Sequence, residues 1–291
     1  MIDLHMHTKY SDGTYTISEI LQEAERIKLE CISITDHDTC LAYNELKSKM
    51  TREKYSGKII PGCELKSIVD GTTIEILGYN VNTDKLNKIL PNFAPTYEKI
   101  NTHETEKLCE IFKERGYTLI TDHLNFDVRK ESGEIAILEE ILSHPENNRF
   151  YQEVNYTDEH EFYRLHMSNP NSPYFIDNSS IIPKPEEVID VIRSVSGLAF
   201  IPHVFIYGEN SKKVFEKLTQ DHLIDGIECY YSKFTDKQIN FLLDYCKENK
   251  YFVSGGTDYH GKLKKEIAMG TGINNNLNIP ACIIEPWAKF I

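Results

Sequence analysis

The sequence predicts an α/β fold, in the form of one α/β barrel with an insertion. Short β-branched runs alternate with helical patterns in residues 1–83 and again after residue 184, which is typical of a mainly parallel sheet with crossover helices. Between residues 84 and 183 the helical periodicity continues without a convincing buried strand. A chain of 291 residues accommodates one such core and one excursion. We therefore expect a barrel over 1–83 and 184–291 and a mostly helical inserted domain over 84–183.

Individual elements follow from local patterns. Thr16 and Glu19 have the spacing of a capping box, and the apolar residues after them recur at helical intervals, which predicts a helix at this point. Further helices are expected at 104–114, 134–142, 185–195, 212–218 and 236–248. Apolar and β-branched runs predict strands at 2–5, 31–35, 58–60, 73–77, 198–201, 226–229 and 251–254.

Composition limits the class of protein. Hydrophobic residues make up 40% and charged residues 26% of the chain, the balance of a soluble globular protein. No run approaches the roughly 20 apolar residues of a membrane helix, and the first residues resemble a strand more than a signal peptide, so we expect no membrane and a cytoplasmic location. Seven cysteines without a CxxC pair favour reduced thiols. A net charge of −13 argues against long nucleic acid as a partner, whereas a small phosphorylated substrate fits if bound metals concentrate positive charge.

Ionisable residues follow the first predicted strand. His5 and His7 alternate on an extended segment, so both imidazoles can approach one metal ion. Such a pair alone is more often incidental than a metal site. The continuation of the chain strengthens the metal interpretation, because Asp12 lies just beyond in a glycine-containing turn.

The same arrangement recurs at other strand ends. The strand at 31–35 ends in Asp36, His37 and Asp38, of which Asp38 is expected only to cap the following helix. Active sites of barrel enzymes are assembled at the carboxyl ends of the strands. The residues at the remaining strand ends are Glu64, His203, Asp258 and His260.

Taken together, these stretches resemble the PHP (polymerase and histidinol phosphatase) family over nearly the whole chain. The matching stretches, in order, are DLHMHTKYSDGTYT, ITDHDT, PGCEL, ILGYN, IPH, DGIECY and SGGTDYHG. The resemblance is closest to stand-alone bacterial members that act on nucleoside 3',5'-bisphosphates or on the 5' ends of short RNA. It implies a distorted seven-stranded (β/α) barrel with an inserted helical domain, which we expect to recognise the substrate.

The resemblance also implies a set of metal ligands. The first metal would be held by His5, His7, Glu64 and Asp258. A second would be held by Asp12, His37 and His260, and Glu64 would bridge toward a third metal bound by His203. The catalytic residues implied are Asp12, His37, Asp258 and His260. Manganese, iron and zinc all suit this mixture of nitrogen and oxygen ligands, so two or three divalent ions of these kinds are expected.

Two departures from the family pattern concern the third metal and the substrate. The family usually has histidine before the stretch ILGYN, where this chain has Glu75, which could ligate a hard cation or be a solvated strand residue. The family's Arg-Pro-His stretch, which contacts substrate phosphate, is replaced by residues 121–124 (TDHL), and the arginine is missing. The substrate-binding residues expected instead are His123, Arg129 and Lys130, although both bases could equally be solvated surface groups.

The chemistry that the resemblance implies is hydrolysis of a phosphate monoester or diester by metal-activated hydroxide. Alternative substrates are histidinol phosphate and cyclic sugar phosphates, and a non-phosphate amidohydrolase on a related barrel is another enzyme class. A degenerate PHP module that only scaffolds a partner is the non-enzymatic alternative. Such a module should have lost its ligands extensively, whereas all but one of the family positions hold a ligating residue here.

Overall fold

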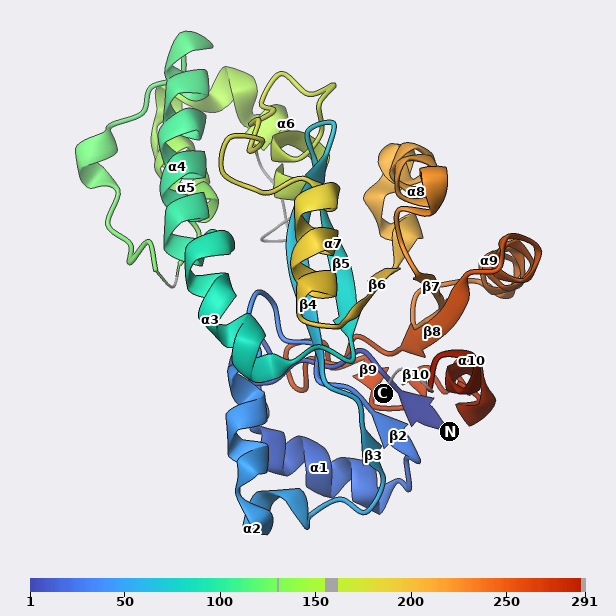
Figure 1. Ribbon diagram of the computed structural model, residues 1–291. Coiled ribbons are helices and arrows are strands. Elements are labelled where there is room, and N and C mark those ends of the chain that lie inside the picture. Colours follow the sequence, from blue (N-terminus) through green and yellow to red (C-terminus); the bar gives the residue numbers. More distant parts are fainter. Residues whose placement is uncertain (130, 155–161, 289–291) are drawn as a thin grey trace. The chain divides into compact units, whose positions relative to one another are not determined.

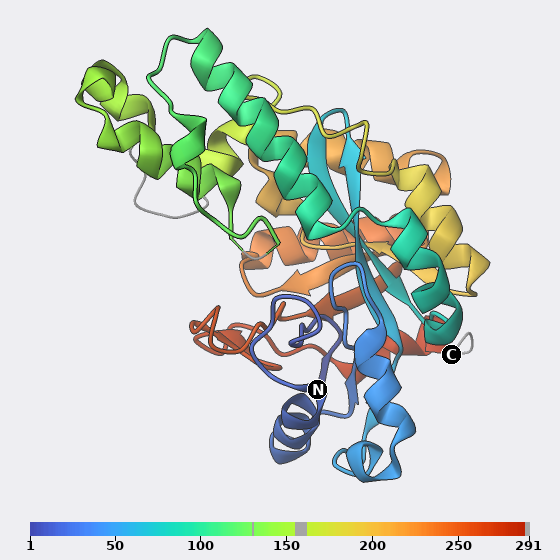
Figure 2. The ribbon, with the colours of Figure 1, turned by 90° about the vertical axis from the view of Figure 1, so that its left-hand side faces the viewer.

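The chain divides into two compact units (Figures 1 and 2). The computed structural model describes residues 1–129, 131–154 and 162–288. The first unit comprises Met1–Ser67, Ile74–Ala94 and Lys184–Ile291, and the second comprises Ile68–Thr73 and Pro95–Pro183.

A small parallel sheet opens the first unit. Its strands lie in the order β1 (Ile2–Asp3), β2 (Cys31–Ile32), β3 (Lys58–Ile59). These strands are shorter than predicted, but the extended segments continue side by side beyond the ladder. There the Thr35 amide donates to the Met6 carbonyl at 2.8 Å. The side chains that follow β1 and β2 are therefore held close together.

Helix α1 (Ile17–Arg26) connects β1 to β2 and begins at the predicted capping box. The Thr16 amide donates to Oε2 of Glu19 at 2.8 Å, and the Glu19 amide donates to Oγ1 of Thr16 at 3.3 Å. Its buried residues are Ile17, Ile20, Leu21 and Ala24. This apolar face explains why the helical spacing was visible in the sequence.

The larger sheet has five strands. They lie in the order β4 (Gly62–Val69), β5 (Thr72–Tyr79), β6 (Leu198–Ile201), β7 (Gly226–Tyr231) and β8 (Phe252–Gly256). The pairs β6–β7 and β7–β8 are parallel, whereas β5–β6 is antiparallel. The predicted α/β class, with mainly parallel pairing, is confirmed.

Helix α7 (Pro185–Ser194) packs on β6, and helix α9 (Asp236–Asn249) packs on β7 (Figure 1). The remaining helical elements of the first unit are η1 (Leu41–Lys47), α2 (Lys49–Arg52), α3 (Thr83–Phe93), η5 (Val204–Asn210), α8 (Ser211–Thr219), η6 (Gln220–His222), η7 (Ala281–Ile284) and α10 (Glu285–Ala288). Trp287 of α10 is fully buried and lies 5.6 Å from the Tyr79 ring and 5.4 Å from the Phe200 ring. Helix α10 thus contributes Trp287 to a core that contains residues of both sheets.

The two sheets meet along isolated backbone contacts. The Leu4 amide donates to the Gly255 carbonyl at 3.1 Å, and Met6 forms a parallel bridge with Tyr259. On the other side, His37 forms a parallel bridge with Glu64. Among the described residues the strands form separate ladders, so a closed seven-stranded barrel is not seen.

Two predicted strand boundaries were wrong. Glu64 does not follow a strand, because the chain resumes an extended course after Pro61 and Glu64 lies inside β4. The strand at β8 is not the last one either, since β9 (Ile267–Ala268) and β10 (Gly272–Ile273) form an antiparallel pair after it.

The second unit is helical, and its described residues between 95 and 183 contain no strand. Its helical elements are α4 (Tyr97–Glu114), η2 (Thr121–His123), α5 (Gly133–Ser143), η3 (Pro145–Phe150), α6 (Tyr151–Val154) and the π-helix η4 (Tyr163–Met167). Helices α4 and α5 pack side by side (Figure 2). Phe112, Phe162 and Tyr174 lie in the buried core of this unit. No helix in the described part of the chain is both long and apolar enough to span a membrane.

Candidate metal centre

The segment after β1 places two imidazoles on one face. The Asp258 amide donates to the His5 carbonyl at 2.8 Å and the His7 amide donates to the Tyr259 carbonyl at 2.9 Å, so the two segments run together. Leu4 and Met6 are fully buried hydrophobic residues. The alternate residues, His5 and His7, are therefore presented together, with ring centroids 5.3 Å apart.

One carboxylate oxygen of Glu64, Oε2, is the point on which three imidazoles converge. This oxygen lies 3.2 Å from Nε2 of His5, 3.3 Å from Nε2 of His7 and 3.3 Å from Nδ1 of His37. Oδ1 of Asp258 lies 3.6 Å from Nε2 of His5 and 3.3 Å from Nε2 of His7. The residues predicted for the first metal are therefore brought together.

A second group of ligands surrounds Asp12. Its Oδ2 lies 3.2 Å from Nε2 of His260 and 3.7 Å from Nε2 of His37. Its Oδ1 lies 3.6 Å from Nδ1 of His7. The structure brings together the three residues predicted for the second metal and adds His7 to them. Nδ1 of His7 faces Asp12, and its Nε2 faces Glu64.

A third group contains Glu64, Glu75 and His203. Nε2 of His203 lies 2.9 Å from Oε1 of Glu64, the oxygen that does not face the other imidazoles. Glu75 is held by Tyr207, whose hydroxyl donates to its Oε2 at 3.1 Å. Burial and the neighbouring charge of Glu64 raise the pKa of Glu75. Glu75 therefore faces Glu64 and His203, and its role as a ligand of a third ion stays a prediction.

The residues present fit divalent metal ions. Nε2 of His7 and Nδ1 of His37 are buried and, within the described part of the chain, lack a partner in hydrogen-bond geometry. Two ligands of an ion with bond lengths of about 2.1 Å are separated by about 3.0–3.4 Å in octahedral or tetrahedral coordination. The spacings of 3.2 and 3.3 Å around Glu64 match this range.

Charge and burial set the ionisation of the centre. Burial opposes protonation of His7, yet Asp258 and Glu64 raise its pKa to about 9. Burial and the charge of His7 lower the pKa of His37 to about 3, despite the nearby Glu64. For Glu64 itself, burial is outweighed by His5, His37 and His203, which hold its pKa well below its usual range. Ionised carboxylates and neutral imidazole are the forms that ligate metals, so a cation that binds here displaces protons.

Three buried carboxylates that were not predicted as ligands contact His5 or residues next to the ligands in the chain. Oε1 of Glu228 lies 2.9 Å from Nδ1 of His5. Asp36 accepts from the Thr8 amide at 2.6 Å and from the Thr8 hydroxyl at 2.7 Å. Asp3 accepts from the hydroxyl of Thr257 at 2.6 Å. Glu228 stands in the stretch DGIECY, but nothing in the neighbouring residues pointed to His5 as its partner.

Asp38 does not cap a helix, which corrects the predicted role. Its Oδ1 accepts the Lys66 amide at 3.0 Å and its Oδ2 lies 3.3 Å from Lys66 Nζ. The helical element that follows, η1, begins after Cys40 without a side-chain cap. Asp38 has a positive φ of 53°, so the chain turns sharply after His37 and the carboxylate reaches β4 instead.

The predicted substrate-binding residues belong to the second unit. Nδ1 of His123 lies 3.2 Å from Oε1 of Glu140. Arg129 pairs with Asp127 through Nε at 2.8 Å and through its terminal nitrogen at 3.1 Å. Lys130 lies outside the described residues. A role of these residues in substrate binding stays a prediction.

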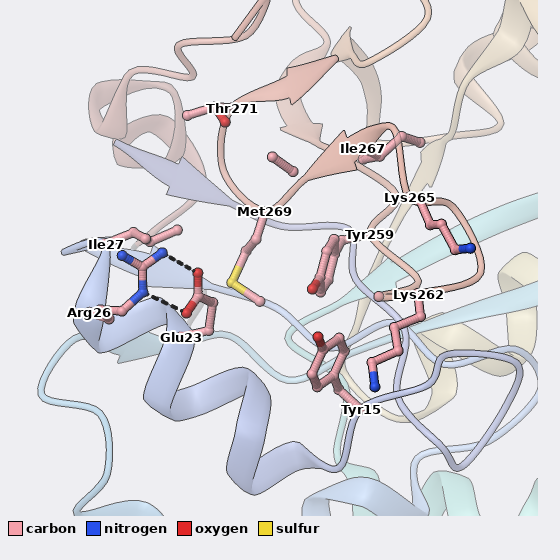
Figure 3. Close-up of a pocket in the computed structure, with 12 residues that line it drawn as sticks. Tyr15, Glu23, Arg26, Ile27, Tyr259, Lys262, Lys265, Ile267, Met269 and Thr271 are labelled. Carbon is pink, nitrogen blue, oxygen red and sulfur yellow. Dashed lines mark hydrogen bonds and ion pairs between the residues drawn. The ribbon is translucent and has the colours of Figure 1, made fainter. Parts of the chain in front are cut away.

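A cavity of about 390 Å³ lies beside the segment that carries Asp258 and His260 (Figure 3). Tyr259, which separates these two residues in the sequence, stacks on Tyr15 in its wall with ring centroids 6.0 Å apart. Lys262 and Lys265 also line the cavity, but none of the predicted metal ligands does. The cavity is therefore distinct from the metal centre.

Comparison with protein families decides the identity of this arrangement. The model of the PHP domain matches residues 3–253. The chain belongs to the PHP domain family. Membership and the converging ligands make it a metal-dependent phosphoric ester hydrolase.

Curated relatives resemble this PHP domain over most of their length. The 5'-3' exoribonuclease Rnm of Escherichia coli (strain K12) is 22% identical over 261 residues, which cover 89% of this chain and 84% of the relative. The 5'-3' exoribonuclease of Haemophilus influenzae is 21% identical over 295 residues, covering 99% of this chain and 98% of the relative.

Solved structures share the fold of this PHP domain. A candidate metal-dependent phosphoesterase from Bifidobacterium adolescentis has a TM-score of 0.64 at 17% identity, covering 99% of this chain and 96% of that chain. An amidohydrolase from Chromobacterium violaceum has a TM-score of 0.62 at 18% identity, covering 90% and 88%. At these identities the likeness shows the fold alone.

Proposed function

We propose that the protein hydrolyses a small phosphate monoester or diester, with the 5' end of a short RNA or a nucleoside 3',5'-bisphosphate as the substrate class. The observation that carries this proposal is the convergence of His5, His7, His37 and His203 on the single carboxylate of Glu64. The full-length similarity to 5'-3' exoribonucleases supports RNA ends over other phosphate esters. The net charge of −13 favours a short over a long chain as substrate.

The centre is proposed to hold two or three divalent ions of manganese, iron or zinc. The ligand groups are His5, His7, Glu64 and Asp258, then Asp12, His37 and His260, and for a third ion Glu64, Glu75 and His203. When bound, such ions polarise phosphoryl oxygens and lower the pKa of water, so no serine or cysteine nucleophile is needed.

The exposed fractions of the ligand side chains support a proposed side of entry for the substrate. The side chain of Asp12 is 46% exposed and that of His37 is 23% exposed, whereas His5 and His7 are fully buried. We place the substrate phosphate at the side of Asp12 and His37. Asp12, His37 and His260 belong to the ligand group at this opening, and Oδ1 of Asp258 lies 3.4 Å from Nδ1 of His260. These four residues are the proposed catalytic groups.

Two finer features of the PHP interpretation are also proposals. The hydrogen bond between Leu4 and Gly255 and the bridge between His37 and Glu64 support a single distorted barrel formed by both main sheets. The inserted helical segment is proposed to recognise substrate, with His123, Arg129 and Lys130 as candidate contacts.

A phosphate-release screen tests the function. The protein is stripped of metal, reloaded separately with manganese, iron or zinc, and given a nucleoside 3',5'-bisphosphate, a 5'-phosphorylated short RNA, histidinol phosphate and a cyclic sugar phosphate. We expect activity on one of the first two, lost in His37→Ala and retained in the matched variant His222→Ala. Hydrolysis of histidinol phosphate alone would replace the proposed substrate class. Absence of phosphate release from all four with every metal would refute the function.

A further inference from the structure

A second group of ligating side chains lies in the helical unit. It consists of His123, Glu140 and His144. Oε1 of Glu140 lies 3.2 Å from Nδ1 of His123 and 2.7 Å from Nε2 of His144. The side chains of Glu140 and His144 are 11% and 17% exposed, and that of His123 is 56% exposed. One carboxylate oxygen thus stands between two imidazole nitrogens, with an open side toward solvent.

Local structure fixes this arrangement. Glu140 lies in the last turn of α5 and His144 directly follows the helix, where its Nε2 reaches back to Oε1 of Glu140. The buried side chain of Asn147 ties the other segment to this helix end: its Nδ2 donates to the carbonyls of Thr118 at 2.7 Å and Ile141 at 2.9 Å. The segment that leads into η2 is therefore joined at Thr118 to the end of α5 by contacts that do not involve the three side chains themselves.

We propose that His123, Glu140 and His144 bind a zinc ion that joins η2 to the end of α5. Two imidazoles and one carboxylate are a zinc donor set, and a water molecule commonly completes such a site. Nitrogen and oxygen ligands of tetrahedral zinc are about 3.3–3.4 Å apart, which small side-chain adjustments reach from the spacings of 3.2 and 2.7 Å.

The position in the fold favours a cation as well. His144 follows the last residue of α5, and the C-terminal end of a helix carries partial negative charge that stabilises cations. His123 lies in the segment that connects α4 to α5, so the ion would fix this segment to the end of α5. This site shares no residue with the centre around Glu64. It assigns His123, a candidate substrate contact in the proposed function, to the zinc ion instead.

The alternative is a metal-free group in which both imidazoles donate hydrogen bonds to Glu140. Zinc content and zinc-dependent stability distinguish the two. The metal-free full-length protein is dialysed against zinc, bound zinc per chain is counted, and thermal unfolding is followed with and without zinc. The variants are Glu140→Gln, His123→Gln and, as matched control, Glu139→Gln, which changes the same charge at the exposed neighbouring residue.

We expect Glu140→Gln and His123→Gln to bind one zinc ion fewer than Glu139→Gln and to lose part of the zinc-dependent rise in Tm. His123→Gln is included because its side chain is largely exposed, so this substitution should not disturb folding. In a His7→Ala background, which impairs the other centre, the difference of one zinc ion between Glu139→Gln and Glu140→Gln should persist whether or not the protein is an active phosphoesterase. Equal zinc content and equal Tm shifts in all three variants would overturn the proposal in favour of the hydrogen-bonded group.

Discussion

Nδ1 of His5 lies 2.9 Å from Oε1 of Glu228, behind the metal centre. Both side chains are fully buried. The other oxygen of Glu228 accepts the backbone amide of His203 at 2.8 Å. Glu228 therefore turns Nε2 of His5 toward Glu64 and at the same time fixes the start of the segment that carries His203. A carboxylate behind a ligating imidazole orients the ring and increases its basicity.

Glu228→Gln should weaken metal binding or turnover by about 10- to 100-fold, because the imidazole of His5 loses its charged partner. Glutamine can still accept the His203 amide, so the fold should persist. Metal titration of the stripped protein and phosphate release give the readouts, with Glu248→Gln on the exposed face of α9 as control. Wild-type affinity and turnover in Glu228→Gln would argue against this supporting role.

Asp258→Asn and His7→Ala should each reduce phosphate release by orders of magnitude, because each alters a ligand of the ions that activate water. The Tyr231 hydroxyl donates to Oδ2 of Asp258 at 3.0 Å. The side-chain oxygen of asparagine can accept the same hydrogen bond, so the fold should persist. Activity is measured together with metal content and circular dichroism. Near wild-type turnover with unchanged metal content in either variant would contradict the proposed mechanism.

Glu75 tests the third ion. Glu75→Ala should lower the occupancy of one ion and leave the others bound, whereas Glu75→His should keep the site and shift its preference toward softer or borderline metals. Tyr207→Phe is the matched control, since it removes the hydroxyl that holds Glu75 but no carboxylate or imidazole. Metals per chain are counted under identical loading. Unchanged stoichiometry and rate in both Glu75 variants would remove Glu75 from the site.

Trp287→Ala should lower the free energy of unfolding by about 3–5 kcal/mol, as expected for a large buried aromatic residue. The side chain is fully buried, and its Nε1 donates to the Val253 carbonyl at 3.0 Å. Urea unfolding of the stripped protein provides the measurement, with Trp287→Phe losing less. A change below about 1 kcal/mol would mean that α10 contributes little to the core.

Features governed by neighbouring residues could be predicted from the sequence. The capping box of Thr16 and Glu19 marked the start of α1, and the strand at 198–201 was predicted with the bounds of β6. The lengths of β1 and β2 were overestimated. The residues after each strand are extended and hydrogen-bonded to each other, but they lie outside the regular ladder. His5 and His7 were recognisable because alternation on an extended segment is itself local.

Features governed by distant residues were missed. Glu228 contacts His5 across 223 positions of the chain, and a single glutamate in an apolar strand carries no local sign of such a partner. Asp38 was predicted to cap a helix because its actual partner, Lys66, is distant in the sequence. The two residues meet only because His37 and Glu64 form a bridge between neighbouring extended segments. Pro61 suggested that the strand at 58–60 ended and that Glu64 followed it. Instead, a new strand, β4, begins at Gly62 and contains Glu64.

Elemental analysis of protein purified without chelator tests the central claim most directly. The ligand groups around Glu64 and Asp12 predict at least two first-row transition metal ions per chain, regained from manganese, iron or zinc after stripping. The count is made in the Glu140→Gln variant, so that an ion bound in the helical unit does not contribute. Two or more ions per chain would agree with the proposed centre, and a protein that contains none and rebinds none would contradict it.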